Sequence, residues 1–75
     1  MTDKDKRIIE NGEANGIPIF VLTAKDMIAV STLARYRDLC KANDCPQSHI
    51  SEVELRMNDF KEWQKKNPAK IKMPD

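Results

Sequence analysis

The chain has no long hydrophobic run, few cysteines and almost no excess of charge of either sign. Its only continuous apolar run, Ile17–Leu22, is far too short to span a bilayer, so we expect no membrane segment. The two cysteines, Cys40 and Cys45, give no disulfide framework. The charged N-terminus leads into no apolar stretch of the kind that a secretory signal needs. Together these absences predict a cytoplasmic protein with reduced thiols.

The balance of charge argues against one class of partner. Lys and Arg number 13 and Asp and Glu number 12, which gives a net charge of +1 with 33% of the residues charged. A domain that binds the phosphate backbone of nucleic acid carries a strong positive excess. We therefore expect a mixed, soluble surface and a partner other than nucleic acid.

The short length limits the size of the core. With 75 residues the chain forms one domain at most, which we place at residues 1–67, with 68–75 as a tail. A domain of this size buries only roughly 60% of the surface that its unfolded chain exposes. Disulfides, metals or oligomerisation usually supply the missing stability. Because disulfides are not expected, the sequence predicts a homo-oligomer.

The N-terminal residues predict a short helix from Thr2 to Asn15. Thr2 is suited to cap this helix, with Asp5 three residues later completing a capping-box pattern. Ile8 and Ile9 would form its apolar side. Gly16 provides a natural end because glycine adopts the left-handed conformation freely.

The run Ile17–Leu22 predicts one short buried strand. Pro18 restricts it to an edge position, because proline has no N–H to donate to a neighbouring strand. Residues 7–10 could pair with it as a hairpin, but their adjacent isoleucines do not alternate as strand residues do. Since the backbone groups of a strand need partners, we expect pairing with the same strand of a second copy across a two-fold axis.

The remainder of the chain predicts a helical hairpin. The turn Thr23–Asp26, with Thr23 as its cap, precedes a first helix that ends near Asn43; a second begins at Pro46 or Ser48 and ends at Asn67. Their apolar seams have helical spacing and comprise Ala29, Leu33, Tyr36 and Cys40 in the first helix and Ile50, Val53, Met57, Phe60 and Trp63 in the second. The predicted fold class is therefore α+β and mostly α.

Three apolar residues are candidates for an interface. Phe20 lies in the predicted strand that pairs with a second copy. Leu55 lies about 140° from Ile50 around the second helix, so it is either an ordinary exposed leucine or part of a surface, with Trp63, that a partner covers. The tail after Pro68 lacks periodicity and is either disordered or held in a groove of a neighbour through Ile71 and Met73.

The segment Pro18–Asp26 carries a resemblance to a known group of proteins. It reads Pro-x-Phe-x-Leu-x-Ala-x-Asp and is followed by a helix with an aromatic residue at Tyr36. This pattern resembles small phage and prophage proteins of unassigned function. The sequence departs from them at Thr23, where they often carry Arg, and at Val30, where a proline often begins the helix. The resemblance implies a mobile-element origin and implies no activity.

Metal binding and catalysis have little support in the sequence. Cys40, Cys45 and His49 have spacings that suggest a zinc site, but structural zinc needs four ligands. Cys40 also belongs to the helical seam, where a free cysteine acts as a small apolar residue. His49 is the only imidazole, no glycine-rich phosphate loop is present, and we expect no enzyme, no metal and no cofactor.

A binding module is the remaining hypothesis. Thr23, Lys25 and Asp26, together with Arg35 and Tyr36, could form a small polar site for an anionic, nucleotide-like ligand. The alternative is that Tyr36 is a core residue, that Lys25 and Arg35 are solvated, and that Asp26 is a cap.

Two biological roles follow from a binding module. For a phage-type protein, sequestering a host signalling nucleotide or blocking a host protein would be consistent roles. The competing hypothesis is a ribbon-helix-helix DNA-binding protein. Both faces of its strand are apolar, and such a ribbon could not read bases.

Overall fold

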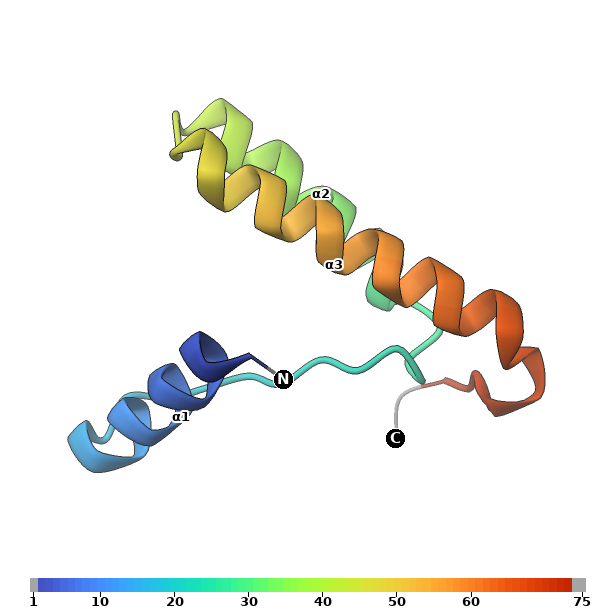
Figure 1. Cartoon of the computed structure of the whole chain (residues 1–75), viewed down its shortest axis with the longest axis horizontal. Coiled ribbons are helices and arrows are strands. Elements are labelled where there is room, and N and C mark those ends of the chain that lie inside the picture. The colour runs from blue at the N-terminus through green and yellow to red at the C-terminus, as the bar shows by residue number, and fades with distance from the viewer. Residues whose placement is uncertain (1, 74–75) are drawn as a thin grey trace.

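The protein is an all-helical chain made of a helical hairpin and a separate N-terminal helix. The computed structural model describes residues 2–73. The hairpin is antiparallel, and an extended segment connects it to the N-terminal helix (Figure 1). The helices are α1 (Asp3–Asn15), α2 (Ala29–Ala42) and α3 (Gln47–Lys66), followed by the short 3-10 helix η1 (Pro68–Lys70).

The predicted α+β class is wrong, because residues 2–73 contain no strand. Residues 17–22 are extended, yet they form no β-bridge with any other described segment. The bridge of β type that the described residues contain joins Asp26 to Lys72 and lies outside this run. The physical reason is that an apolar run becomes a strand only when a neighbour satisfies its backbone groups, and residues 2–73 supply no such neighbour for positions 18–22.

Helix α1 follows the local signals in the sequence, as predicted. The Asp5 backbone N–H donates to the Thr2 hydroxyl oxygen at 3.1 Å, and the Thr2 N–H donates to the Asp5 carboxylate at 3.3 Å. Both halves of the capping box are therefore present. The helix ends at Gly16, whose φ of 64° is left-handed, and the Ile17 N–H then donates to the Gly12 carbonyl at 2.8 Å.

The hairpin contains the only closed core in the described chain. Ala29 is fully buried, and the other buried apolar residues have exposed fractions of 7% or less. Four seam residues depart from the prediction: Tyr36 is 47% exposed, and three others are only half-buried, namely Leu33, Phe60 and Trp63. The core consists of Ala29 and Cys40 from α2 and Ile50, Val53 and Met57 from α3.

The connection between α2 and α3 depends on one residue in the left-handed conformation. Asp44 has φ of 55°. Its N–H donates to the Lys41 carbonyl at 3.3 Å, and the Cys45 N–H donates to the Cys40 carbonyl at 2.9 Å. This pair of bonds is a Schellman motif, in which glycine usually occupies the left-handed position.

The opposite end of the hairpin is closed by the turn before α2 and by the chain after α3. The Lys72 N–H donates to the Lys25 carbonyl at 2.9 Å, and the Met27 N–H donates to the Lys72 carbonyl at 3.0 Å. The Gln64 amide donates to the carbonyls of Ala24 and Asp26 at 3.1 and 3.3 Å. Part of the predicted tail is thus held by the hairpin, whereas residues 74 and 75 lie outside the described residues.

The turn before α2 differs from the prediction in one respect. The side-chain acceptor in it is Asp26, whose carboxylate accepts from the Ile28 N–H at 2.9 Å. Thr23 contributes its backbone carbonyl, which accepts from the Asp26 N–H at 3.2 Å. The turn is therefore stabilised by its last residue, Asp26, and α2 begins without a side-chain cap.

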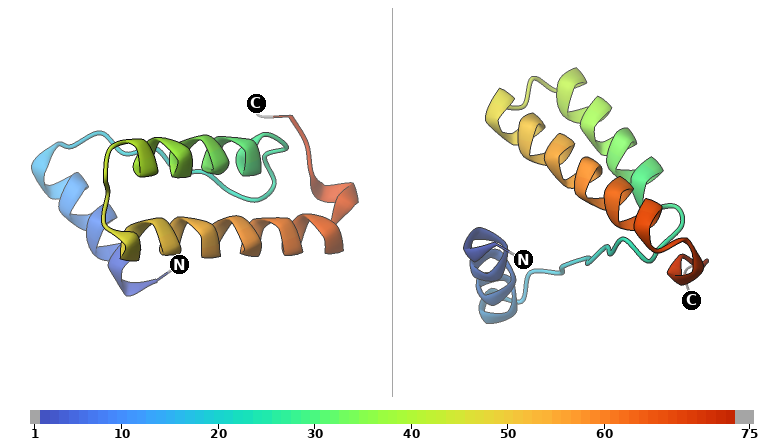
Figure 2. Two further views of the ribbon diagram at one scale, coloured as in Figure 1. Left: turned by 90° about the horizontal axis from the view of Figure 1, so that it is seen from above. Right: turned by 45° about the vertical axis from the view of Figure 1, so that its right-hand side comes forward.

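The molecule is more open than a compact protein of its length. Helix α1 does not pack closely against α2 or α3 (Figures 1 and 2). The Cα radius of gyration is 13.7 Å, whereas about 11 Å is expected for 75 residues. No helix in residues 2–73 is long and apolar enough to cross a bilayer. The division at residue 67 and the oligomeric state stay predictions.

The left-handed conformation of Asp44 generates a stability prediction. We expect Asp44→Gly to raise the free energy of unfolding by about 0.5 to 1 kcal/mol, because glycine adopts positive φ without a steric penalty. Urea denaturation measures the difference. Ala42→Gly is the matched control, and it should lower stability by up to about 1 kcal/mol, because Ala42 is helical. Equal effects of the two substitutions would contradict the assignment of the Schellman motif.

Candidate functional site

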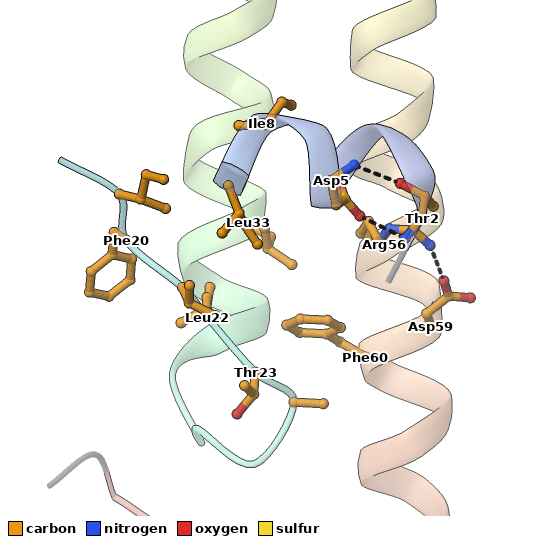
Figure 3. A pocket seen from close by; sticks show the side chains of 14 residues that line it. Thr2, Asp5, Ile8, Phe20, Leu22, Thr23, Leu33, Arg56, Asp59 and Phe60 are labelled. Carbon is orange, nitrogen blue, oxygen red and sulfur yellow. Dashed lines mark hydrogen bonds and ion pairs between the residues drawn. The ribbon is translucent and has the colours of Figure 1, made fainter. Parts of the chain in front are cut away.

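An apolar groove separates α1 from the hairpin. It has a volume of about 740 Å³, within the range of roughly 300 to 1000 Å³ that is typical of binding pockets. Three parts of the chain form it: one side of α1, the extended segment, and facing positions of α2 and α3 (Figure 3). The apolar lining residues are Ile8, Ile9, Ile19, Phe20, Val21, Leu22, Ala24, Leu33 and Phe60.

Charged groups form one end of this groove. Arg56 donates to the Asp59 carboxylate at 2.9 Å across one turn of α3. Beside this pair lies the capping box of Thr2 and Asp5 (Figure 3). Hydrogen bonding to Thr2 holds the pKa of Asp5 below its ordinary value, so Asp5 is ionised at neutral pH. The site is therefore an apolar hollow with a polar rim, the pattern of many protein-binding surfaces.

The extended segment at the mouth of the groove is held loosely. Residues 18–22 form no backbone hydrogen bond to any part of the chain between residues 2 and 73. Phe20 is 84% exposed, and its ring points away from that of Phe60 (Figure 3). A phenylalanine contributes a large apolar area when it is buried. Phe20 is therefore the large apolar side chain of the site that is most exposed to solvent.

Gly12 determines how closely the segment approaches α1. It is the buried residue of α1, and a Cβ added there would collide with the Ile19 side chain and lie 3.3 Å from the Ile17 carbonyl oxygen. Because Gly12 has no Cβ, α1 can contact the extended segment that follows it, at Ile17 and Ile19. The glycine that weakens the helix in isolation thus positions Ile19 on one wall of the groove.

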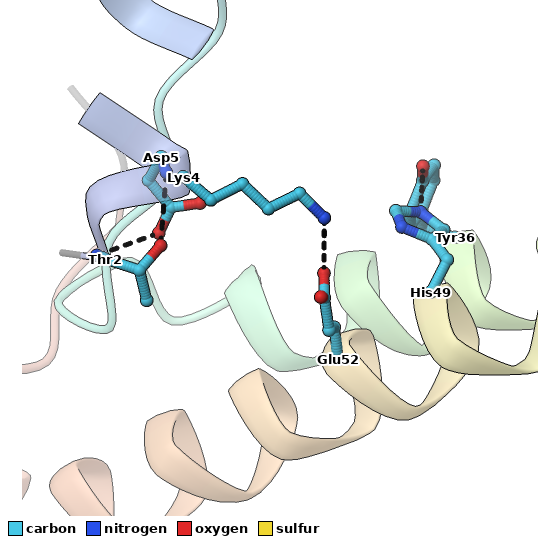
Figure 4. Close-up of polar contacts among 6 residues, drawn as sticks. All are labelled: Thr2, Lys4, Asp5, Tyr36, His49 and Glu52. Carbon is cyan, nitrogen blue, oxygen red and sulfur yellow. Dashed lines mark hydrogen bonds and ion pairs between the residues drawn. The ribbon is translucent and has the colours of Figure 1, made fainter. Parts of the chain in front are cut away.

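A smaller cavity of about 350 Å³ adjoins the groove and has more polar contacts. The Lys4 ammonium lies 2.9 Å from the Glu52 carboxylate and connects α1 to α3 (Figure 4). The Tyr36 hydroxyl and His49 Nε2 share a hydrogen bond of 2.9 Å, with the rings edge-to-face at 5.8 Å between centroids. These two contacts fix the polar side of the site.

The five predicted ligand-binding residues do not all line the same one of the two cavities. Thr23 lines the groove and Tyr36 lines the smaller cavity, whereas Lys25, Asp26 and Arg35 line neither. The Asp26 carboxylate accepts from the Ile28 N–H in the turn before α2, and α2 itself has no side-chain cap. Tyr36 lies about 10 Å along α2 from the first residue of that helix at 1.5 Å per residue. The five residues therefore do not line either of these two cavities together.

The three predicted interface residues have different surroundings. Phe20 is at the mouth of the groove, and Leu55, 62% exposed, lines the smaller cavity. Trp63 is half-buried and lines neither cavity. Sequence reasoning singled out only Thr23 and Phe20 among the groove residues and missed the others, including Ile8 of α1, which is 54% exposed. The sequence signal that could have identified Ile8 was its position on the apolar side of α1.

Cys40, Cys45 and His49 are the residues that the sequence offers for metal binding or nucleophilic catalysis. Within residues 2–73 no three His, Cys, Asp or Glu side chains gather as a metal site requires. Interaction with Cys40 raises the pKa of the Cys45 thiol, which disfavours the thiolate, whereas a nucleophilic cysteine needs a lowered pKa. Cys40 itself is buried, and His49 is engaged with Tyr36.

Comparisons with protein-family models, with curated proteins and with solved structures found no match to this chain. The case for a function therefore depends on the residues and the geometry of the groove.

The ion pair between α1 and α3 generates a titration prediction. Lys4 holds the pKa of Glu52 below its ordinary value, so this contact contributes stability above the ordinary carboxyl pKa. That contribution is lost as the pH falls through the lowered pKa. We expect Lys4→Met to raise the pKa of Glu52 toward its ordinary value, measured by NMR titration.

Lys6→Met provides the matched control for this titration. It removes the same charge from an exposed position of α1 and should leave the pKa of Glu52 lowered. Added salt should weaken the effect of Lys4, because both side chains of the pair are 54% exposed. An ordinary pKa for Glu52 in the unchanged protein would show that α1 is not held against α3.

Proposed function

We propose that this chain is a non-catalytic binding protein that holds another polypeptide by its apolar side chains in the groove between α1 and the hairpin. The observation that carries the proposal is the groove itself, an open apolar hollow of about 740 Å³. An exposed apolar surface rimmed by polar residues marks an interaction site in soluble proteins. The target that fits this groove is an uncharged, apolar segment of another protein.

The charges of the site favour a protein over a nucleotide-like ligand. A phosphate site brings several unpaired cations together. Here Arg56 is paired with Asp59 and Lys4 with Glu52, both at 2.9 Å. Lys25 and Arg35, the cations proposed for an anionic ligand, line neither cavity. Apolar contact is therefore the main source of affinity available in the groove.

DNA binding receives less support for two reasons. The ribbon of that hypothesis needs paired strands, and the described residues contain none. The net charge of +1 also lacks the positive excess that a phosphate backbone attracts.

The resemblance to phage and prophage proteins is a further part of the proposal, and in that setting the blocked partner would be a host protein.

Binding of the fluorescent dye anilinonaphthalene sulfonate at low micromolar protein concentration tests the groove. We expect the dye to gain fluorescence with the unchanged protein, since it reports exposed apolar surface. Ile8→Asp should reduce that signal several-fold, because it places a charge in the apolar lining.

Leu39→Asp is the matched control for the dye experiment. Leu39 is 55% exposed, close to the 54% of Ile8, and it lines neither cavity. Its substitution adds the same charge to a helix and should leave the dye signal unchanged. Equal losses in the two variants, or no signal in the unchanged protein, would contradict an apolar binding site in the groove.

A further inference from the structure

The exposed area of this chain exceeds what a compact monomer presents to solvent. The accessible surface is 6009 Å², whereas a compact monomer of this size exposes about 4700 Å². The excess is about 1300 Å², and a stable interface of standard size covers about 800 Å² on each partner. The surplus is therefore large enough to be one face of a dimer.

This surplus includes the apolar side chains of the extended segment. Phe20 is 84% exposed, Val21 62% and Ile17 54%. No charged residue occurs from position 14 to position 24. Interface cores are depleted of charge in the same way and enriched in aromatic residues. A second copy can approach this face without like-charge repulsion.

The same face contains a projection and a hollow. Phe20 projects at the mouth of the groove, and Leu33 and Phe60 line its interior (Figure 3). A two-fold interface uses one patch on both subunits, so each residue must find its complement on that same patch. A protruding aromatic ring beside an apolar hollow meets this requirement.

We propose that the occupant of the groove is a second copy of this chain, in a two-fold dimer in which Phe20 of each protomer enters the groove of the other. This inference rests on the proposed function, because it names the polypeptide that the groove holds. It assigns Phe20 as the anchor of the interface, where buried aromatic residues commonly carry much of the binding energy. The helices keep their places in each protomer.

Sedimentation velocity over a range from low micromolar to several hundred micromolar tests the dimer. The unchanged protein should convert reversibly from monomer to dimer as its concentration rises. Phe20→Asp should weaken the dimer by at least about tenfold, the effect of losing an anchor residue. Because Phe20 is largely exposed within one chain, circular dichroism should show the same helix content in this variant.

Leu39→Asp is again the matched control, since Leu39 is exposed and belongs to neither cavity. It should dimerise as the unchanged protein does. The position of Phe20 is tested by a benzoylphenylalanine photo-crosslinker introduced there, in a mixture of isotope-labelled and unlabelled chains. Links between chains should map to the peptides that contain Ile8, Leu33 or Phe60.

Three results would overturn the second copy as occupant. They are a monomer at every concentration, a dimer of unchanged strength in Phe20→Asp, or crosslinks confined to the outer face of α2. A monomer that still binds the dye in the groove would leave the proposed function intact with a different protein as target. Loss of dye binding at low concentration would instead contradict the proposed function, so the two failures are distinguishable.

Discussion

The packing of α2 against α3 is the constraint on which the rest of the structure depends. Ala29 has no side chain beyond Cβ and is fully buried, which lets the start of α2 lie close to α3. Cys40 closes the other end of the same seam. Every other element is attached to this pair of helices by backbone hydrogen bonds or ion pairs. The hairpin can therefore keep its form while α1 and the extended segment remain open to a partner.

The distribution of apolar residues explains where binding is possible. Five apolar residues are buried in the hairpin, and as many large apolar residues are exposed along α1 and residues 17–22. Small domains leave a large share of their surface uncovered because their surface grows relative to their volume. Here four of the exposed large apolar residues line one groove, namely Ile8, Ile19, Phe20 and Val21. An apolar surface gathered in one place supports binding better than the same area scattered over the molecule.

The candidate site shows why sequence proximity is a poor guide in a helical hairpin. Lys25 and Asp26 precede α2, whereas Tyr36 follows after two turns of it, so the rise of the helix carries Tyr36 toward α1 and His49. The proposed polar site required these residues to converge, and they do not share a cavity. Ile8 is distant in sequence from the hairpin and nevertheless lines the groove, because α1 returns beside α3 through the contact of Lys4 with Glu52.

The sequence by itself determined the features that depend on neighbours along the chain. The capping box at Thr2 and the helix end at Gly16 are local patterns that the structure contains. The two apolar seams of the hairpin are also local patterns, and the structure buries five of their nine residues. The state of residues 17–22 was decided only by the tertiary structure, because an extended run becomes a strand through a partner, and residues 2–73 provide none. The groove was likewise decided by tertiary structure, since residues of α1, the extended segment, α2 and α3 line it together.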